Sequence, residues 1–188
     1  LGQIQSAVSN MDAILSELTQ YSRPLQLATE PVDLVDLTRE VCEFVMPSYE
    51  EKGVALAISP LALASDEGPL ERLELPLDRG KMRQALLNLL KNALEATAPG
   101  KAVEVVLASR RHDEQVFVKV KDQGEGVRPE ILAKLFTPYF STKGNGTGLG
   151  LAHVRKILQA HGGNADLLWS EPGVGSTFAL VLPRRDGA

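Results

Sequence analysis

The segment STKGNGTGLGLAHVRKI, residues 141–157, places four glycines within seven positions directly before an apolar run with helical spacing. The first amides of a helix have no intrahelical partner and lie at the positive end of the helix dipole. A glycine-rich loop that leads into a helix is therefore typical of an anion site. We expect this segment to bind a small anion such as phosphate, although the GxxxxGK[ST] pattern of a Walker-type loop is absent.

A second group of polar residues lies within RQALLNLLKNALEA, residues 83–96, whose leucines have helical spacing. Asn88, Asn92 and Glu95 fall at i, i+4 and i+7 on another face of that helix. Asparagine is a poor helix former, so two of them one turn apart need a reason. One interpretation is a solvated polar face. The other is that the amide oxygens bind a hard cation such as Mg²⁺, which shares its ligands with substrate phosphates.

The third candidate is DQGEG, residues 122–126, which directly follows an alternating strand. Asp and Gly dominate turns for local reasons, so a simple strand-ending turn is one interpretation. The functional interpretation is that Asp122 accepts a hydrogen bond from the amino group of a base, while the glycines leave room for a flat ring. LFTPYFSTK, residues 135–143, follows, and its aromatic residues suit either the core or a lid over a ligand; for Phe136 the core is favoured.

The composition excludes several classes of protein. With 188 residues and 44% apolar content the chain is globular, and a net charge of −4 argues against a generic nucleic-acid binder. Cys42 is the only cysteine, which excludes an intrachain disulfide and favours a cytoplasmic location. The sequence has neither a membrane-spanning run nor a signal peptide. Because it begins without Met, we expect a piece of a longer protein, whose remaining part would carry any membrane anchor.

The elements that position these residues follow from the apolar spacing. Residues 3–22 carry an apolar residue every three or four positions, which predicts a helix with one narrow seam that needs a partner. The seam consists of Ile4, Val8, Met11, Leu15 and Leu18. Pro24 ends this helix, and residues 24–31 are predicted to be an extended linker. A mixed domain over residues 32–184 follows.

Within that domain, Asp33 or Asp36 is expected to cap a helix that runs to about Glu51 and ends at Gly53. Its expected inward residues are Leu37, Val41, Phe44 and Val45. The other expected elements are strands at 53–59, 73–77, 102–109, 115–122, 164–170 and 177–182, a loop at 60–69, a helix at 79–98 capped by Asp78, and a helix after the glycine loop. This order predicts an α+β sandwich with helices on one face of a mixed sheet.

Five motifs, taken in order, resemble the N, G1, F, G2 and G3 boxes of the sensor histidine kinase ATP-binding domain. They are NLLKNALEA, DQGEG, LFTPYFSTK, GTGLGLA and GVGSTF. The resemblance covers about residues 30–183 and is nearest to the nitrogen-regulator type of kinase. It implies a Bergerat fold, a two-layer α/β sandwich, that binds ATP and Mg²⁺. Residues 1–23 are similar to the second helix of the family's dimerisation and phosphotransfer hairpin.

The resemblance also implies roles for individual residues. Asn92 would bind Mg²⁺, Asn88 would support the phosphates or the metal shell, Asp122 would read adenine, and Thr177 would assist adenine through water. Residues 137–150 would form a mobile lid over ATP. The full implied ATP-binding set is Asn88, Asn92, Asp122, Gly124, Gly126, Phe140, Lys143, Gly146, Thr147, Gly148, Leu149, Gly150 and Thr177, with Phe140 packing the lid down and Lys143 adding a positive charge.

The chain departs from the family in one respect that bears on catalysis. It lacks the box resembling H-[ED]-x-x-[NT]-P that carries the phosphoacceptor histidine, and it has no catalytic nucleophile of its own. His112, His153 and His161 are interpreted as structural, with a cationic His161 suited to a helix end. Glu95 occupies a position that is often basic in relatives, so the resemblance implies no phosphate contact there.

The implied function is transfer of the γ-phosphate of ATP to a histidine on a dimerisation domain, for relay to the receiver domain of a response regulator. Weak homodimerisation through residues 3–22 is also expected. Two alternatives remain: a related ATP hydrolase, disfavoured because Asn88 replaces the glutamate that activates water, and a non-catalytic nucleotide-binding switch. An anti-sigma serine kinase is a lesser alternative, disfavoured by the N-terminal seam.

Overall fold

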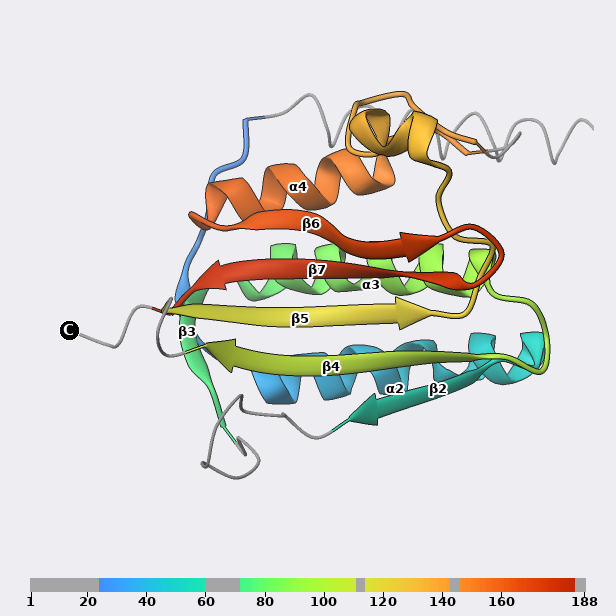
Figure 1. Ribbon diagram of the computed structural model, residues 1–188. Helices are drawn as coiled ribbons and strands as arrows, with labels where there is room; N and C mark the ends of the chain where they lie inside the picture. The colour runs from blue at the N-terminus through green and yellow to red at the C-terminus, as the bar shows by residue number, and fades with distance from the viewer. Residues whose placement is uncertain (1–23, 60–71, 111–113, 143–145, 185–188) are drawn as a thin grey trace, which may run out of the picture.

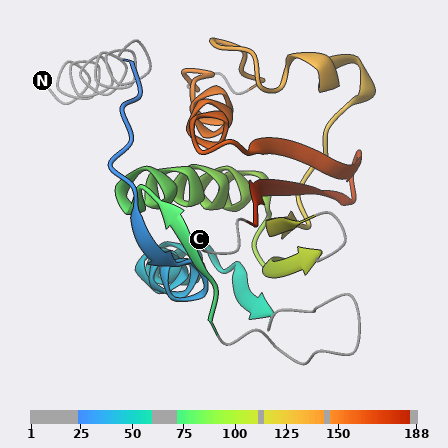
Figure 2. The ribbon, with the colours of Figure 1, turned by 90° about the vertical axis from the view of Figure 1, so that its left-hand side faces the viewer.

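The computed structural model describes residues 24–59, 72–110, 114–142 and 146–184, which form two layers (Figures 1 and 2). One layer is a five-stranded sheet with the order β2-β4-β5-β7-β6, and helices α2, α3 and α4 cover one of its faces. The described elements are β1 (Glu30–Asp33), α2 (Leu34–Lys52), β2 (Ala55–Ser59), β3 (Glu74–Leu77), α3 (Arg79–Ala96), β4 (Ala102–Arg110), β5 (Gln115–Asp122), the 3₁₀ helix η1 (Pro129–Lys134), α4 (Gly150–Ala160), β6 (Asn164–Glu171) and β7 (Gly175–Pro183). The predicted α+β sandwich is confirmed.

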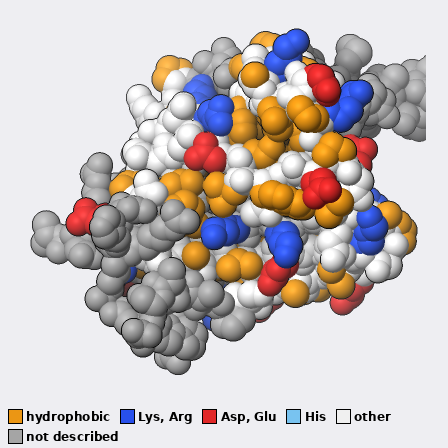
Figure 3. All heavy atoms as spheres, in the orientation of Figure 1, with side chains coloured by type: hydrophobic (Ala, Val, Ile, Leu, Met, Phe, Trp, Pro, Cys, Tyr) orange, Lys and Arg blue, Asp and Glu red, His pale blue; other side chains and the backbone are white. Residues whose placement is uncertain are grey.

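The large sheet is mixed because β2 pairs with β4 in parallel, whereas the pairs β4–β5, β5–β7 and β6–β7 are antiparallel. Strands β1 and β3 form a separate antiparallel pair. Side chains alternate along β5, so Val116, Val118 and Val120 are buried against the helices. The other face of the sheet is seen in Figure 3, where apolar side chains gather between charged ones.

Side-chain caps fix where the two long helices begin. Asp33 accepts a hydrogen bond from the amide of Val35 at 3.0 Å, and Asp78 accepts one from the amide of Lys81 at 3.0 Å. Each carboxylate satisfies an amide that has no partner within its helix. Gly53, with a φ of 70°, ends α2 in the left-handed conformation, as its sequence position predicted.

Helices α2 and α3 are joined through the last turns of α2. The buried Tyr49 donates its hydroxyl to the carbonyl of Leu90 at 2.7 Å. Lys52 donates to the carbonyl of Leu94 at 2.6 Å, in the last turn of α3. Burial raises the pKa of Tyr49, and the nearby Cys42 and Asp122 act in the same direction, so its hydroxyl stays protonated and remains a donor.

One expectation about the elements is wrong, and two boundaries differ from those expected. Phe44 does not face inward: it is 63% exposed, and the guanidinium of Arg83 lies 4.5 Å from its ring centroid. Helix α3 ends at Ala96 because Thr97 is extended. Strand β1 was not predicted, and it begins inside the segment interpreted as a linker. The helix expected at residues 3–22 lies outside the described residues, as does the loop at 60–69.

Candidate nucleotide site

The carboxylate of Asp122 lies at the end of β5 and is almost completely buried, with 4% of the residue exposed. Its Oδ1 accepts a hydrogen bond from the amide of Gly124 at 2.8 Å. Burial raises the pKa of Asp122, while hydrogen bonds from the amides of Gly124 and Ser176 act in the opposite direction. The carboxylate is thus buried and held by backbone amides, and since each carboxylate oxygen accepts more than one hydrogen bond, it is suited to accept another from the amino group of a ligand.

The strand register changes the residue expected beside this carboxylate. Ser176 of β7 pairs with Asp122, whereas Thr177 pairs with Lys121. Because successive side chains point to opposite faces of a sheet, Thr177 lies on the face away from Asp122. The prediction that Thr177 assists adenine through water does not fit this position. Ser176 is buried, and its hydroxyl lies 3.0 Å from that of Ser170 in β6. The sequence motif contained both residues, and only the register distinguishes them.

The glycines around Asp122 allow close approach of backbone segments. A Cβ at Gly124 would lie 2.7 Å from the carbonyl oxygen of Ala96, at the end of α3. A Cβ at Gly126 would lie 2.1 Å from the carbonyl oxygen of Glu171, and Gly126 has a φ of 69°. Gly124 and Gly126 are therefore required for the turn to pack against α3 and β6. This packing is a structural reason for the two glycines, beside the expected one of leaving room for a flat ring.

The described part of the glycine loop packs onto the aromatic segment before it. Gly148 has a φ of 68°, and a Cβ there would lie 2.5 Å from the backbone of Tyr139 and 2.6 Å from that of Phe140. The amide of Leu149 is 3.4 Å from the hydroxyl of Thr147, and the side chain of Leu149 is buried, so any ligand contact at Leu149 uses its backbone. The predicted Lys143 lies outside the described residues, and Gly146 begins the described part after it.

Helix α4 begins without a side-chain cap, because Leu149 occupies the N-cap position and forms no capping hydrogen bond. Apart from the amide of Leu149, its first amides therefore have no side-chain cap, which suits the binding of an anion. Asn92 of α3 lies at the same place: its Nδ2 is 3.8 Å from where a Cβ on Gly150 would be. The structure thus brings together the asparagine helix and the end of the glycine loop, which are more than 50 residues apart in the sequence.

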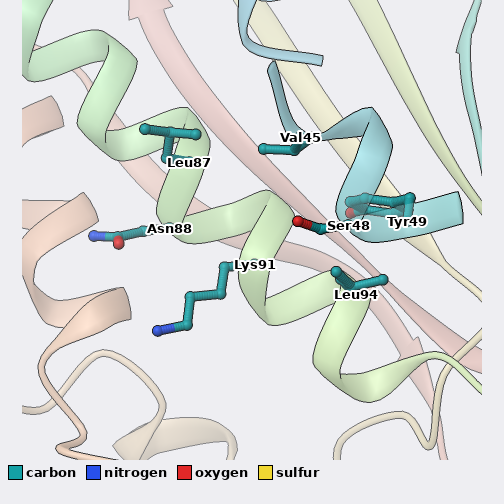
Figure 4. A pocket seen from close by; sticks show the side chains of 7 residues that line it. All are labelled: Val45, Ser48, Tyr49, Leu87, Asn88, Lys91 and Leu94. Atoms are coloured by element: carbon teal, nitrogen blue, oxygen red, sulfur yellow. The ribbon is translucent and has the colours of Figure 1, made fainter. Parts of the chain in front are cut away.

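Asn88 lies one turn before Asn92 and borders a groove of about 240 Å³ between α2 and α3. The groove is lined by Val45, Ser48, Tyr49, Leu87, Asn88, Lys91 and Leu94. Figure 4 shows Asn88 and Lys91 extending from α3 away from the side chains of α2. Sequence reasoning missed Lys91, although its position directly before Asn92 was a signal that a positive charge lies near the predicted metal ligand.

The root of the predicted lid is fixed by Phe136. Its ring packs edge-on against Phe178 of β7, with centroids 6.4 Å apart, and the guanidinium of Arg155 in α4 lies 3.6 Å from its centroid. Arg155 also donates to the carbonyl of Ala165 at 2.8 Å. The interpretation of Phe136 as a packing residue is confirmed. Arg155 also holds this ring in place, and the sequence alone did not indicate that contact.

Of the three histidines, His153 is buried in α4 and His112 lies outside the described residues. His161 has Nδ1 2.8 Å from the carbonyl of Ile157, and its Nε2 accepts a hydrogen bond from the amide of Asp78 at 3.0 Å. A carbonyl only accepts, so Nδ1 carries the proton, and Nε2 must be unprotonated in order to accept. His161 is therefore neutral in this arrangement, and the expectation of a cationic side chain is wrong.

The donor chemistry fits an Mg²⁺ ion that is shared with phosphates. Among the residues that the structure describes, no group of three or more His, Cys, Asp or Glu side chains is placed to hold a metal. Mg²⁺ usually keeps several waters and takes one or two protein oxygens together with substrate phosphates. The side-chain amide of Asn92, whose Nδ2 lies beside the start of α4, also carries an oxygen of the kind that such a site uses. None of the described helices is long and apolar enough to span a membrane.

Comparison with known proteins places this geometry in a family. Residues 77–186 match the family described as histidine kinase-, DNA gyrase B- and HSP90-like ATPase. The sensor histidine kinase ZraS of Klebsiella oxytoca is 36% identical over 174 residues, which are 92% of this chain and 35% of that protein. The chain therefore spans about a third of the length of this relative.

Two solved structures share the fold. Full-length ShkA in complex with AMPPNP superimposes with a TM-score of 0.75 and 30% identity, over 95% of this chain and 36% of that one. Histidine kinase ThkA in complex with the response regulator protein TrrA has a TM-score of 0.75 and 25% identity, over 97% of this chain and 49% of that one.

Proposed function

We propose that this chain, which belongs to the family of histidine kinase-, DNA gyrase B- and HSP90-like ATPases, is the ATP-binding catalytic domain of a sensor histidine kinase. The observation that carries the proposal is that three features come together at one end of the helix layer. They are the buried Asp122 carboxylate, the Asn92 amide and the uncapped start of α4. The likeness to ZraS, ShkA and ThkA, each named as a kinase or solved with an ATP analogue, supports this choice within the family.

In the proposed complex, the Asp122 carboxylate accepts a hydrogen bond from the adenine amino group. The amides that begin α4 donate to phosphate oxygens, and the side chain of Asn92 supplies an oxygen to Mg²⁺. Bound Mg²⁺ would neutralise charge on the phosphates during transfer. The chain's residues therefore hold and orient ATP, and an acceptor outside them receives the γ-phosphate.

Transfer to a protein acceptor is favoured over hydrolysis by the chemistry of α3. Asn88 precedes Asn92 by one turn, and its neutral amide cannot remove a proton from water at any useful pH. We propose that the acceptor is a histidine on a dimerisation hairpin of the parent protein or of its dimer mate, with residues 1–23 as the hairpin's second helix. The ThkA complex supports a response regulator as the next partner.

Binding titrations test the nucleotide site. The wild-type chain with Mg²⁺ should bind ATP in preference to GTP, because the exocyclic amino group of adenine is a donor and guanine presents a carbonyl at that position. Asp122→Asn should weaken ATP binding and reduce this preference, since an amide presents a donor as well as an acceptor. If both proteins bound ATP equally and discriminated equally against GTP, the assignment of Asp122 would be wrong.

A second variant separates the metal from the base. Asn92→Ala should lower the affinity for ATP in the presence of Mg²⁺ and leave the ATP to GTP ratio unchanged, because the adenine contact is intact. Equal Mg²⁺ dependence of binding in Asn92→Ala and the wild type would contradict the role of Asn92.

A further inference from the structure

The two helices that border the proposed nucleotide site also meet at their opposite ends. At the site, Asn92 of α3 lies beside Gly150 of α4. At the other end, the amide of Asp78, directly before α3, donates to Nε2 of His161, directly after α4, at 3.0 Å. Asp78 and Asn92 are 14 positions apart, which is about 21 Å along the helix at 1.5 Å per residue. In Figure 1 the arrowhead of β5, where Asp122 lies, is at one side of the sheet. β3, which leads into the start of α3, is at the opposite side.

The contact between Asp78 and His161 has a fixed direction. Because Nδ1 of His161 is held by the carbonyl of Ile157 in α4, the ring is anchored to its own helix at 2.8 Å, and its Nε2 is aimed at the amide of Asp78. A displacement of α4 relative to α3 breaks this hydrogen bond. The contact therefore fixes the relative position of the two helices at the end distant from the nucleotide.

Asp78 brings a third segment to the same point. Its Oδ1 caps α3 through the amide of Lys81, and its Oδ2 accepts from the amide of Ala28 at 3.0 Å, in the segment that leads into β1. Although burial acts in the opposite direction, the hydrogen bonds from Lys81 and Ala28 hold the pKa of Asp78 below its usual value. The carboxylate is thus charged at neutral pH and accepts from both amides at once.

We propose that Asp78 and His161 are positioning residues for the nucleotide site, and that they transmit a displacement of the chain at Ala28 to the spacing of α3 and α4. The inference rests on the proposed function. ATP contacts both helices, so its affinity depends on their separation, and positioning within a fraction of an ångström matters for such a site. The segment containing Ala28 is where the chain enters the domain from residues 1–23, so the junction places an incoming displacement next to the helices that hold ATP.

Variants of His161 test the positioning role. His161→Gln keeps an acceptor oxygen that can reach the amide of Asp78, whereas His161→Leu removes the acceptor. With Mg²⁺ present, the Kd for ATP should rise about threefold to tenfold in His161→Leu and stay within about twofold of wild type in His161→Gln. Both variants are measured well below their melting temperatures, with folding checked by circular dichroism. A folded His161→Leu that binds ATP as the wild type does would overturn the positioning role.

Variants of Ala28 test the connection to the linker. Ala28→Pro removes the amide donor, and Ala28→Gly keeps it, so only the proline variant should weaken ATP binding. The effects of Ala28→Pro and His161→Leu should be non-additive, because both act through Asp78. By reciprocity, ATP should slow hydrogen exchange of the Ala28 amide. Additive effects with unchanged exchange would overturn the transmission.

The wild-type titration separates this inference from the proposed function. A wild-type chain that binds no ATP would overturn the proposed function, and the positioning role with it. Wild-type binding with equal affinities in all four variants would overturn the inference alone.

Discussion

Gly126 offers a sharp test of how the turn after Asp122 is built, because the chain contains a matched glycine elsewhere. Gly126 and Gly100 have φ values of 69° and 80°, so alanine is strained at both. A Cβ at Gly126 would lie 2.1 Å from the carbonyl oxygen of Glu171, whereas nothing lies within 4 Å of a Cβ at Gly100. The two substitutions therefore share the backbone strain and differ in the steric overlap.

The magnitudes follow from that difference. A left-handed alanine costs about 1 to 2 kcal/mol, which is the whole expected effect of Gly100→Ala. In Gly126→Ala the turn and the end of β6 must also separate by roughly 1 Å to reach a normal contact, which adds about 1 to 3 kcal/mol. We expect Gly126→Ala to lower the free energy of unfolding by about 3 kcal/mol.

The assay is denaturant unfolding of both variants, followed by ATP titration under conditions where each is folded. Gly126→Ala should also weaken ATP binding, because moving the turn moves the carboxylate of Asp122, whereas Gly100→Ala should bind ATP normally. Equal losses of stability in the two variants, or normal ATP binding by Gly126→Ala, would refute the reasoning.

Three further predictions concern buried groups. Cys42 is fully buried, and burial, with a smaller contribution from Glu43, raises its pKa to about 11. In the folded chain its alkylation at pH 8 should therefore be slower than that of a free cysteine by roughly a hundredfold or more. Fast labelling of the folded chain would contradict this. Tyr49→Phe removes the donor to the carbonyl of Leu90 and should lower the free energy of unfolding by about 1 kcal/mol in urea titrations; an unchanged midpoint would show that this hydrogen bond contributes nothing. The raised pKa of Asp122 means that its carboxyl keeps its proton to higher pH in the folded state than in the unfolded state. Its contribution to stability therefore falls as pH rises through the folded-state pKa, whereas ATP affinity falls as pH decreases through the same pKa. Asp122→Asn should lack both dependences, and pH profiles identical to those of the wild type would refute the prediction.

Much of the fold was predictable because local signals agreed with the packing. Gly53 and Asp78 are found at the helix ends where their capping chemistry placed them, and of the two caps expected for α2 the structure has Asp33. The alternation in β4 and β5 identified the hairpin, since each strand has one face against the helices. Phe44 was misplaced because its helical spacing matched the apolar stripe, while the ring lies on the outer surface beneath Arg83.

The site was predictable in its components and less so in its contacts. Asn92 and the glycine loop were named from composition and spacing, and the structure brings them together. The choice between Ser176 and Thr177 depends on strand register, which a motif of adjacent residues does not contain. The neutral state of His161 follows from Asp78, 83 positions away, and no local pattern reports a contact at that separation.

Phosphoryl transfer to a supplied acceptor tests the central claim most directly. The chain is incubated with Mg²⁺ and ATP labelled at the γ-phosphate, alone and with the histidine-bearing dimerisation hairpin of its parent protein. The proposed function predicts no label on the chain alone and label on the hairpin that is lost in acid and stable in base, as phosphohistidine is. Asn92→Ala should abolish this transfer, whereas His153→Gln should preserve it wherever the variant folds. Stable label on the isolated chain, mapped to His112, His153 or His161, or a hairpin that stays unlabelled while ATP is bound, would contradict the claim.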